Sequence, residues 1–492
     1  MQDFLFQIKR SGTTSLQSQI REVLVSAILA GHLPAGERIP STREMSKTLG
    51  VSRNTVLLTY LGLVEDGYLL VRNRSGYYVN GEMLNGFAQK PPHPPRAKPP
   101  QGENTRKWQK RFRVHPGQQE NIKKPANWLD YPYPFIYGQV DHKNFPMAEW
   151  RECQRQALGK KWLNVWTEDI RDRDDVVLVE QIRKRLLPRR GIMAAPDEIL
   201  VTLGAQNALY LLASLLVSPQ SVIGFENPGY PDARNIFALK TPRIRSLSVD
   251  EQGLVVDAAL DACDMVFVTP SHQFPTTVTL SRERRQALIS KAREKDIIII
   301  EDDYEFETNY LSEPTPALKS LDTDGNVLYV GSLSKSLFPG LRIGFLVAPR
   351  TVIAEARALR RLMMRHPPCN NQRTTALFLS LGHHDALLHR LNRSYRERWR
   401  VMGEALKTHL PDSARVPSFG GSSYWVRGPE GLNANTLAKA ALQEGIIIEP
   451  GRIFFHDKKP PENYFRLGFS SIECERIAPG IRKLACLIGN QP

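Results

Sequence analysis

The chain has 492 residues, about three times the length of a typical domain, and its 41% apolar and 24% charged residues are typical of globular proteins, so several domains are expected. An excess of 66 basic over 51 acidic side chains gives a formal charge of +15, which favours a polyanionic partner, either nucleic acid or a membrane surface. The chain shows no signal peptide, no apolar run near the ~20 residues that span a bilayer, and five scattered cysteines without a CxxC spacing, which excludes secreted, transmembrane and cysteine-zinc proteins and predicts a cytoplasmic location.

The first two predicted helices are marked by periodicity and by capping residues. Apolar residues between positions 16 and 28 fall on one helical face, and Gly31 follows as a terminator. Ser41 is a cap for the second helix, TREMSKTL, and Glu44 three residues later completes a capping box. Gly50 predicts the end of that helix.

A third helix and a β-hairpin complete this part of the chain. Ser52 is the predicted cap, and the residues of this helix that face inward are Val56, Tyr60, Leu63 and Val64. YLLVRNRSGYYV then forms two β-rich runs around a turn, which predicts a wing with arginines at its tip. Two helices joined by a short glycine turn are the helix-turn-helix plan, whose second helix enters the major groove of DNA.

The runs IPSTREMSKTLGVSRNTV and GYLLVRNRSGYYV resemble the GntR-type winged helix-turn-helix over residues 12–80. The resemblance implies an α+β winged domain, assigned to residues 1–80, and a double-stranded DNA operator as its partner. Hydroxyls, an amide and guanidinium groups at the start of the recognition helix suit phosphates and base edges. By position, the residues implied to meet DNA are Arg43, Ser52, Arg53, Asn54, Thr55, Ser75 and Gly76.

Residues 81–129 have a different composition, with eight prolines and a net charge of +7. They include KPPHPPRAKPP and RKWQKRFR, and they show almost no apolar periodicity. Because prolines favour extended polyproline geometry, we predict a semi-rigid basic linker that leads to a second domain at residues 130–492. The basic run is either a solvated tether or an additional phosphate contact.

The second domain alternates strand-like and helical runs. SVIGFE, MVFVTP, IIIIEDDY and VLYVGSLS are separated by segments with a period of 3.6 residues. This alternation predicts an α/β fold with a mostly parallel sheet. Ligands of such sheets bind at the carboxyl ends of the strands.

The run GSLSKSLFPGLRIGF places Lys335 in a serine-rich turn after a strand, with Arg342 seven residues later. A lysine that forms a Schiff base must lose its proton easily, and burial and nearby cationic charge lower its pKa. Hydroxyls and an arginine beside it are what a phosphate monoester requires. Taken alone, the run is equally consistent with a surface loop.

Further motifs favour a cofactor site. IIIIEDDYEFE puts Asp302 and Tyr304 at the end of a buried strand, where a carboxylate can hold a pyridinium nitrogen protonated and a phenol can bond the 3-oxygen of the ring. TLGAQNALYLLASLL places Gly204, Ala205 and Gln206 at a helix start, where backbone N–H groups bind phosphate readily.

Four other residues are candidates for the same site. Tyr230 in ENPGYPD is placed to stack on a cofactor ring, and His272 and Gln273 in TPSHQFPT lie at another strand end. Arg466 in YFRLGFS stands among apolar neighbours and needs an anionic partner, either a ligand carboxylate or an internal acidic side chain.

Together these motifs resemble fold-type I, aspartate aminotransferase-like, pyridoxal phosphate enzymes over about residues 130–488. Joined to the winged domain, the chain resembles the MocR/GabR family of bacterial regulators, with EDDY, SLSKSLFPGLR and RLGFS in order. The resemblance implies pyridoxal 5'-phosphate as the cofactor, Lys335 in the internal aldimine, Asp302 at the pyridine nitrogen, Tyr304 at the 3-hydroxyl and Tyr230 on the ring. It places Arg466 on the effector carboxylate, and around the phosphate it places Ala205, Gln206, Ser332, Ser334 and Arg342.

Two positions depart from the patterns that are usual in these families. SHQFPTT stands where aminotransferases show NPTG, so His272 or Gln273 replaces the asparagine near the 3-hydroxyl and Thr277 replaces the glycine. Members that sense γ-aminobutyrate carry an arginine two residues after the stacking tyrosine, where this chain has Asp232. A carboxylate there favours a cationic group, so we predict an amino compound with a second basic or polar group, contacted by Arg466 and Asp232.

The sequence is consistent with three functions. The favoured one is a regulator in which a small amino effector forms an external aldimine at the expense of Lys335 and thereby changes DNA affinity. The family implies a head-to-tail homodimer, which would present two winged domains to paired half-sites. An aminotransferase with a DNA-binding appendage is the alternative, because the residues for half-transamination are present. A large domain that no longer takes a cofactor is disfavoured, since every cofactor-contacting residue type is kept.

Other polar residues are interpreted as having no functional role. They are the solvated acids Glu301 and Asp303, the surface histidines His383, His384 and His389, and a basic helical face, solvated or at an interface, of Arg360, Arg361 and Arg365.

Overall fold

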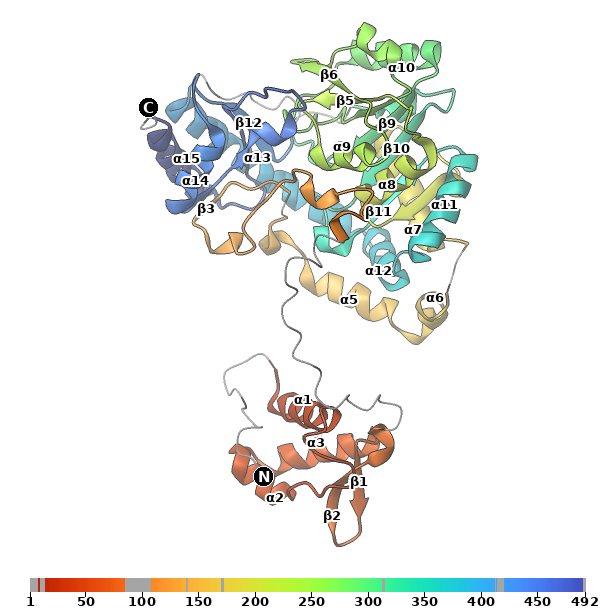
Figure 1. The fold of residues 1–492 in the computed structure, drawn as a ribbon, viewed down its shortest axis with the longest axis vertical. Helices are drawn as coiled ribbons and strands as arrows, with labels where there is room; N and C mark the ends of the chain where they lie inside the picture. Colours follow the sequence, from red (N-terminus) through yellow and green to blue (C-terminus); the bar gives the residue numbers. More distant parts are fainter. Residues whose placement is uncertain are drawn as a thin grey trace. The chain divides into compact units, whose positions relative to one another are not determined.

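The computed structural model describes residue 8 and residues 14–84, 108–138, 140–169, 172–311, 315–411, 413 and 420–489. The chain divides into two compact units, Met1–Phe112 and Arg113–Pro492, and each is described by itself (Figure 1). The proline-rich part of the predicted linker, residues 85–107, lies outside the described residues. Of the helices in the described ranges, none is long and apolar enough to cross a membrane.

The first unit is a three-helix domain with a two-stranded wing. Its elements are α1 (Leu16–Leu29), α2 (Thr42–Leu49), α3 (Arg53–Glu65), β1 (Leu69–Arg72) and β2 (Gly76–Val79). The two strands pair antiparallel, with Leu69 opposite Val79. Apolar side chains from all five elements form one core around Tyr60, which is fully buried.

Local capping interactions set the helix ends as predicted. The Ser41 hydroxyl accepts a hydrogen bond from the Glu44 amide, and the Glu44 carboxylate accepts one from the Ser41 amide. Gly50 ends α2 with φ of 62°, a left-handed conformation that glycine adopts without steric cost. The Ser52 hydroxyl accepts from the Thr55 amide (3.1 Å) at the start of α3. The winged helix-turn-helix is therefore confirmed.

An eight-stranded sheet forms the centre of the second unit, in the order β4-β11-β10-β9-β8-β5-β6-β7. The strands are β4 (Ile199–Thr202), β5 (Ile223–Asn227), β6 (Ile244–Asp250), β7 (Gly253–Leu254), β8 (Met265–Val268), β9 (Ile298–Asp303), β10 (Val327–Ser332) and β11 (Gly344–Val347). The pairs from β10 to β6 are parallel, whereas β11 is antiparallel to both of its neighbours and β7 to β6. The four quoted runs each contain a strand, which confirms the mostly parallel sheet.

Helices cover both faces of this sheet. Leu328 and Val330 of β10 pack with α8 (Ala205–Leu216), α9 (Pro231–Ala238) and α11 (Arg350–Met364). On the opposite face, Val327 packs with α10 (Arg282–Lys295). Tyr329 packs in the same cluster as α7 (Val176–Gln181) and α12 (Cys369–Ser380). Because both faces are buried, the strands are continuous apolar runs rather than alternating ones.

A smaller layer follows the sheet in the chain and is drawn in blue in Figure 1. Its antiparallel sheet has the order β12-β15-β14, and β13 pairs with β3. The strands are β3 (Tyr133–Pro134), β12 (Ser423–Arg427), β13 (Ile446–Ile447), β14 (Glu449–Pro450) and β15 (Tyr464–Gly468). The remaining helices of the unit are α5 (Met147–Ala157), α6 (Leu163–Thr167), α13 (His383–His409), α14 (Ala434–Gln443) and α15 (Cys474–Gly489).

The second unit begins earlier in the chain than the boundary that we placed at residue 129. Residues 113–129 belong to it, and Gln119 donates a hydrogen bond to the Asn235 carbonyl (3.1 Å) on α9. Asn235 Nδ2 in turn donates to the Glu120 carbonyl (2.9 Å). Polar contacts with the backbone hold this segment, so it carries none of the apolar periodicity by which a folded segment is recognised.

Three residues that we interpreted as solvated are buried ion-pair or hydrogen-bond partners. Glu301 accepts hydrogen bonds from the backbone amides of residues 318 and 319 (2.8 and 2.9 Å). Asp303 pairs with Arg190 (2.6 Å), and Arg360 pairs with Asp174 (2.7 Å). The prediction was wrong because charged residues enter a core when partners from distant segments neutralise them.

His384 was also wrongly assigned to the surface. Its Nε2 lies 3.1 Å from the Ser336 hydroxyl and 3.3 Å from the Glu307 carboxylate. Burial lowers the pKa of His384 to about 4, so its ring is neutral at pH 7. His383 is half-buried and His389 is exposed.

Candidate functional site

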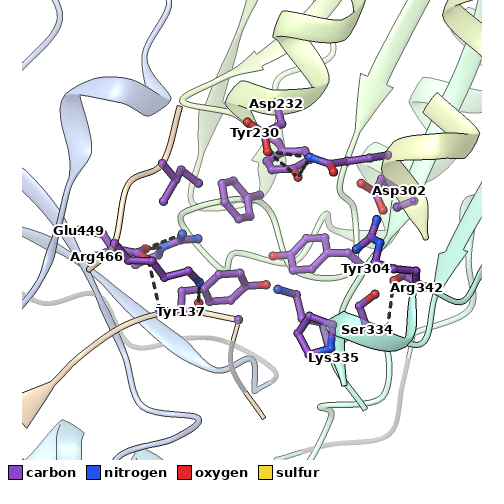
Figure 2. Close-up of a pocket in the computed structure, with 18 residues that line it drawn as sticks. Tyr137, Tyr230, Asp232, Asp302, Tyr304, Ser334, Lys335, Arg342, Glu449 and Arg466 are labelled. Atoms are coloured by element: carbon purple, nitrogen blue, oxygen red, sulfur yellow. Dashed lines mark hydrogen bonds and ion pairs between the residues drawn. The ribbon is translucent and has the colours of Figure 1, made fainter. Parts of the chain in front are cut away.

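A cavity of about 300 Å³ lies where β9 and β10 end and where α8 and α9 begin (Figure 2). This is the edge of the sheet at which open α/β folds bind ligands. The predicted residues that line it are Ala205, Gln206, Tyr230, Asp232, Asp302, Tyr304, Ser332, Ser334, Lys335, Arg342 and Arg466. The fold therefore brings together side chains that are spread over the whole second unit.

Lys335 loses its proton more easily than an ordinary lysine. Burial is the main cause that lowers its pKa to about 8. The Arg466 guanidinium also lowers this pKa, whereas the Glu305 carboxylate raises it. The Nζ atom lies 4.2 Å from the centre of the Tyr137 ring. Gly138 has φ of 80°, a conformation that favours glycine, and a Cβ atom there would lie 2.5 Å from Nζ and would displace the amine.

Asp302, at the end of β9, faces the same cavity. Burial raises its pKa to about 8, and the nearby Asp303 carboxylate raises it as well. Its Oδ1 atom is buried without a hydrogen-bond partner among the residues that the structure describes. A buried carboxylate oxygen normally accepts a hydrogen bond, and a protonated ring nitrogen would donate one to Asp302.

Two tyrosines lie on different sides of the cavity. Tyr304 donates a hydrogen bond from its hydroxyl to the His272 carbonyl (2.8 Å). Tyr230 caps α9, and its ring meets Phe274 edge-on with centroids 5.0 Å apart. Figure 2 shows Tyr230 and Tyr304 pointing into the cavity from separate elements, which leaves space for a planar ring.

The start of α8 and Arg342 form a polar cradle. Gly204 is the N-cap residue of α8 and has φ of 77°. Because glycine has no side chain, it makes no capping hydrogen bond to the first amides of the helix. A Cβ atom at Gly204 would lie 2.7 Å from the Arg342 guanidinium, which donates to the Leu203 carbonyl (2.8 Å). Ser332 and Ser334 line the same end, and the Ser332 hydroxyl accepts from the Ser334 amide (3.2 Å).

Arg466 has an internal acidic partner. It lies on β15 directly opposite Glu449 of β14, and its Nε and Nη2 atoms are 2.7 and 2.6 Å from one carboxylate oxygen. The other oxygen of Glu449 accepts a hydrogen bond from the Tyr137 amide (3.3 Å). The guanidinium also stacks 4.0 Å from the centre of the Tyr137 ring and 4.4 Å from that of Phe274. The sequence left a ligand carboxylate and an internal salt bridge open, and the salt bridge is present.

Asp232 lies near the other end of the cavity (Figure 2). Its carboxylate accepts hydrogen bonds from Gln206 Nε2 (2.8 Å) and from the Tyr230 hydroxyl (3.3 Å). Burial raises its pKa above the ordinary value. Asp232 is thus tied to two residues predicted to hold the cofactor, whereas Arg466 is on the opposite side.

The residues predicted to meet DNA lie on the first unit and are mostly exposed. Arg43 on α2 and Arg53 and Asn54 at the start of α3 are exposed. Ser52 and Thr55 bond to each other through their hydroxyls (2.8 Å), so they are first of all the cap of α3. In the wing, the Ser75 hydroxyl bonds to that of Tyr78 (2.6 Å), and Gly76 has φ of 114°.

Two family models match the chain. The gntR family of bacterial regulatory proteins matches residues 16–79, and the aminotransferase class I and II family matches residues 168–484. The HTH-type transcriptional regulator TauR of Rhodobacter capsulatus is 43% identical over 98% of both chains. The probable rhizopine catabolism regulatory protein MocR of Rhizobium meliloti is 31% identical, over 97% of this chain and 94% of its own.

The chain belongs to the MocR/GabR family of transcriptional regulators. Its second unit also resembles solved aminotransferases. The kynurenine aminotransferase of Pyrococcus horikoshii is 26% identical, with a TM-score of 0.70 over 77% of this chain and 97% of the enzyme. The α-aminoadipate aminotransferase LysN of Thermus thermophilus, solved with N-(5'-phosphopyridoxyl)-L-leucine, is 28% identical, with a TM-score of 0.70 over 78% of this chain and 98% of the enzyme.

The aminotransferase class to which this part of the MocR/GabR regulator belongs depends on pyridoxal phosphate. The cavity fits that group at three of its polar points. Asp302 has an unpartnered oxygen for the ring nitrogen, Lys335 has a lowered pKa, and the uncapped start of α8 lies beside Arg342 for the phosphate.

Three predicted cofactor residues do not line this cavity. Gly204 lies directly before the lining residue Ala205, next to the Arg342 guanidinium. His272 is buried, and its backbone carbonyl rather than its ring meets Tyr304. Gln273 is buried, with Nε2 bonded to the carbonyls of Pro228 and Phe274 (2.8 Å each). His272 and Gln273 are kept out of the cavity by the turn after β8, which directs the neighbouring Phe274 into it. The Phe274 ring therefore stands where the sequence predicted a polar side chain.

The sequence also missed several residues that line the cavity. They are Ile122, Lys124, Tyr137, Gly138, Phe274, Pro339 and Glu449. The only signal in the sequence was proximity to a recognised motif, as for Phe274 beside Gln273. Pro339 lies inside the motif SLSKSLFPGLR. The other five come from segments without a motif, and only the folded chain brings them to the site.

Proposed function

We propose that this MocR/GabR regulator binds pyridoxal phosphate at Lys335 and that a small amino compound, by taking the place of Lys335, changes the affinity of the protein for its operator. The observation that carries the proposal is a buried lysine with a pKa of about 8 in one cavity with an unpartnered Asp302 oxygen. Perturbed groups that meet in a cavity are typical of a functional site.

Pyridoxal phosphate, when bound, would supply an aldehyde carbon that forms a Schiff base with a primary amine. The chain's own residues account for the rest. Burial lowers the pKa of the Lys335 amine to about 8, so that a larger fraction of it is neutral and nucleophilic near pH 7 than in an ordinary lysine, and Asp302 is placed to hold a proton on the ring nitrogen. The α8 amides and Arg342 are placed to bind the phosphate, and Tyr230 and Tyr304 to orient the ring.

The operator would be read by the first unit. Arg43, Arg53 and Asn54 are exposed at the helix-turn-helix and carry groups that bond phosphates and base edges. We also propose a head-to-tail homodimer, because two winged domains can then meet two half-sites of a DNA palindrome.

The test of the proposal is the visible absorption spectrum of the purified full-length protein with added pyridoxal phosphate, titrated with primary amines. The proposal predicts a Schiff-base absorption band at about 420 nm that shifts as an amine binds. Lys335→Ala should lose the band while its far-ultraviolet circular dichroism stays that of the wild type. A colourless wild type, or a band retained by Lys335→Ala, would remove Lys335 from the site.

The same samples separate a regulator from an aminotransferase. An aminotransferase would consume an amino acid and a keto acid in repeated turnovers, whereas a regulator binds its amine without net turnover. Sustained formation of the new amino acid would contradict the proposed function.

A further inference from the structure

The Tyr137 ring forms a wall of the cavity between two cationic side chains. The Lys335 Nζ atom lies 4.2 Å from the centre of this ring, and the guanidinium carbon of Arg466 lies 4.0 Å from it. Figure 2 shows the ring between the two side chains. The negative face of an aromatic ring attracts a cation, and the attraction is stronger where water is excluded. Tyr137 is only 7% exposed, so both contacts are made away from water.

The surrounding structure fixes the position of this ring. The Tyr137 amide donates a hydrogen bond to the Glu449 carboxylate (3.3 Å), and Gly138 follows with φ of 80°. The rings of Phe274 and Tyr304 meet the Tyr137 ring at a steep angle, with centroids 5.7 and 6.3 Å away. Because both its backbone and its ring are held, Tyr137 offers a preformed place for a cation.

The contact with Tyr137 matters more for Lys335 than for Arg466. The Arg466 guanidinium is also paired with Glu449 (2.7 and 2.6 Å). It lies 4.4 and 5.0 Å from the centres of the Phe274 and Phe454 rings as well. Within the described part of the chain, Tyr137 is the one ring within about 6 Å of Lys335 Nζ, and no carboxylate lies at ion-pair distance from this atom.

Several charged groups act on Lys335 from beyond ion-pair distance. Besides burial, the groups that affect its pKa are carboxylates that raise it, Glu305 and Glu449, and cations that lower it, Arg466 and Lys124. The cavity also contains Asp302, Tyr304 and Tyr137, and burial raises the pKa of each of these three groups. The charged groups oppose one another, whereas the neutral Tyr137 ring acts in one direction only, toward the ammonium form of Lys335.

We infer that Tyr137 is a positioning residue for Lys335, whose ring binds the ammonium form of the free lysine and holds the side chain where it reacts. This inference rests on the proposed function and adds the residue that holds its reactive lysine. The ring thereby acts against burial, which favours the neutral amine. A cation–π contact away from water is worth about one pKa unit, so removal of the ring has a measurable effect.

The test measures the pKa of Lys335 in the full-length protein freed of cofactor. Acetic anhydride acetylates only the neutral amine, so the rate of acetylation of Lys335 between pH 6 and pH 11, followed by mass spectrometry of its peptide, gives that pKa. Tyr137→Leu should lower the pKa by about one unit, a tenfold change in the ratio of charged to neutral amine. Tyr137→Phe keeps the ring and should have the pKa of the wild type.

Two more variants make the comparison specific. Tyr137→Met also lacks the ring and should lower the pKa as Tyr137→Leu does, which keeps the test valid if one of the two variants does not fold by circular dichroism. Phe454→Leu removes a ring that lies against Arg466 but does not line the cavity, so the pKa of Lys335 should not change. An unchanged pKa in the folded variants without the Tyr137 ring, or an equal decrease in Tyr137→Phe or Phe454→Leu, would overturn the inference.

The outcomes also separate this inference from the function on which it rests. A wild type that forms no Schiff base with pyridoxal phosphate overturns the proposed function, whatever the pKa of Lys335. A wild type that shows the Schiff-base absorption band, together with an unchanged pKa in Tyr137→Leu and Tyr137→Met, removes Tyr137 alone.

Discussion

The ionisation of Lys335 depends on which groups surround it after folding. Its pKa is lowered to about 8 by burial, and the charges nearest to it, Glu305 and Arg466, act in opposite directions. An ordinary lysine with a pKa of 10.5 is almost wholly protonated at pH 7 and a poor nucleophile. The cavity therefore makes the neutral amine available near physiological pH.

The lowered pKa of Lys335 predicts a pH profile for cofactor loading. The rate at which protein stripped of cofactor binds pyridoxal phosphate should rise roughly tenfold per pH unit below about pH 8 and level off above it, because only the neutral amine reacts. Stopped-flow absorption between pH 6 and pH 10 measures the profile. A rate that keeps rising to pH 10 would mean that Lys335 titrates as an ordinary lysine.

A control is needed because Asp302 also has a pKa of about 8. Asp302→Asn removes the carboxyl group that shares the cavity with Lys335, so loading should be weaker but the profile should keep its inflection. An inflection lost in Asp302→Asn would assign it to the carboxyl group instead.

Single residues were predictable where a short motif fixed both their type and their position. Asp302 lies at the end of a buried strand, and Tyr304 and Lys335 follow the ends of buried strands, so the shared sheet edge brings the three together. Glu449 and Tyr137 were not predictable, because their roles arise from contacts with Arg466 that form only in the folded chain. The burial of His384 was not predicted for the same reason, because nothing near it in the sequence indicates that Ser336 and Glu307 contact its ring.

At the scale of elements, local signals were sufficient for the first unit. Capping by Ser41 and Ser52 and the left-handed Gly50 set the ends of α2 and the start of α3. The segment at residues 113–129 could not be predicted, because contacts to Asn235 rather than an apolar face hold it. Where an element is stabilised by tertiary polar contacts, periodicity gives no signal.

The exposed start of α3 leads to a prediction about DNA binding. Arg53→Ala should lower the affinity for the operator about 10-fold and reduce by about one the slope of log K against log salt, because one cationic contact is lost. Fluorescence anisotropy with DNA selected by the protein from a random-sequence library measures both quantities. The cofactor spectrum should be unaffected.

The matched control is Arg400→Ala, which removes an exposed arginine from α13 in the second unit. It should leave both the affinity and the salt slope unchanged. If Arg53→Ala behaves as Arg400→Ala does, the start of α3 is not at the DNA interface.

At the scale of the whole molecule, the chain joins a DNA-binding unit to a unit with the fold of an enzyme. Coupling between two sites requires that a ligand of one has different affinities for two states of the protein. A coupling free energy of about 1.4 kcal/mol changes operator affinity about tenfold, which one charge-assisted hydrogen bond can supply. An effector that pairs with one charged side chain of the cavity has such an interaction available.

The most direct test of this account is the operator affinity of the full-length, cofactor-loaded protein, measured with and without an amine that shifts its absorption spectrum. If occupancy at Lys335 controls DNA binding, the amine changes the dissociation constant of the wild type at least about fivefold and that of Lys335→Ala not at all. An unchanged affinity of the wild type, or the same change in Lys335→Ala, would contradict the claim that occupancy at Lys335 controls DNA binding.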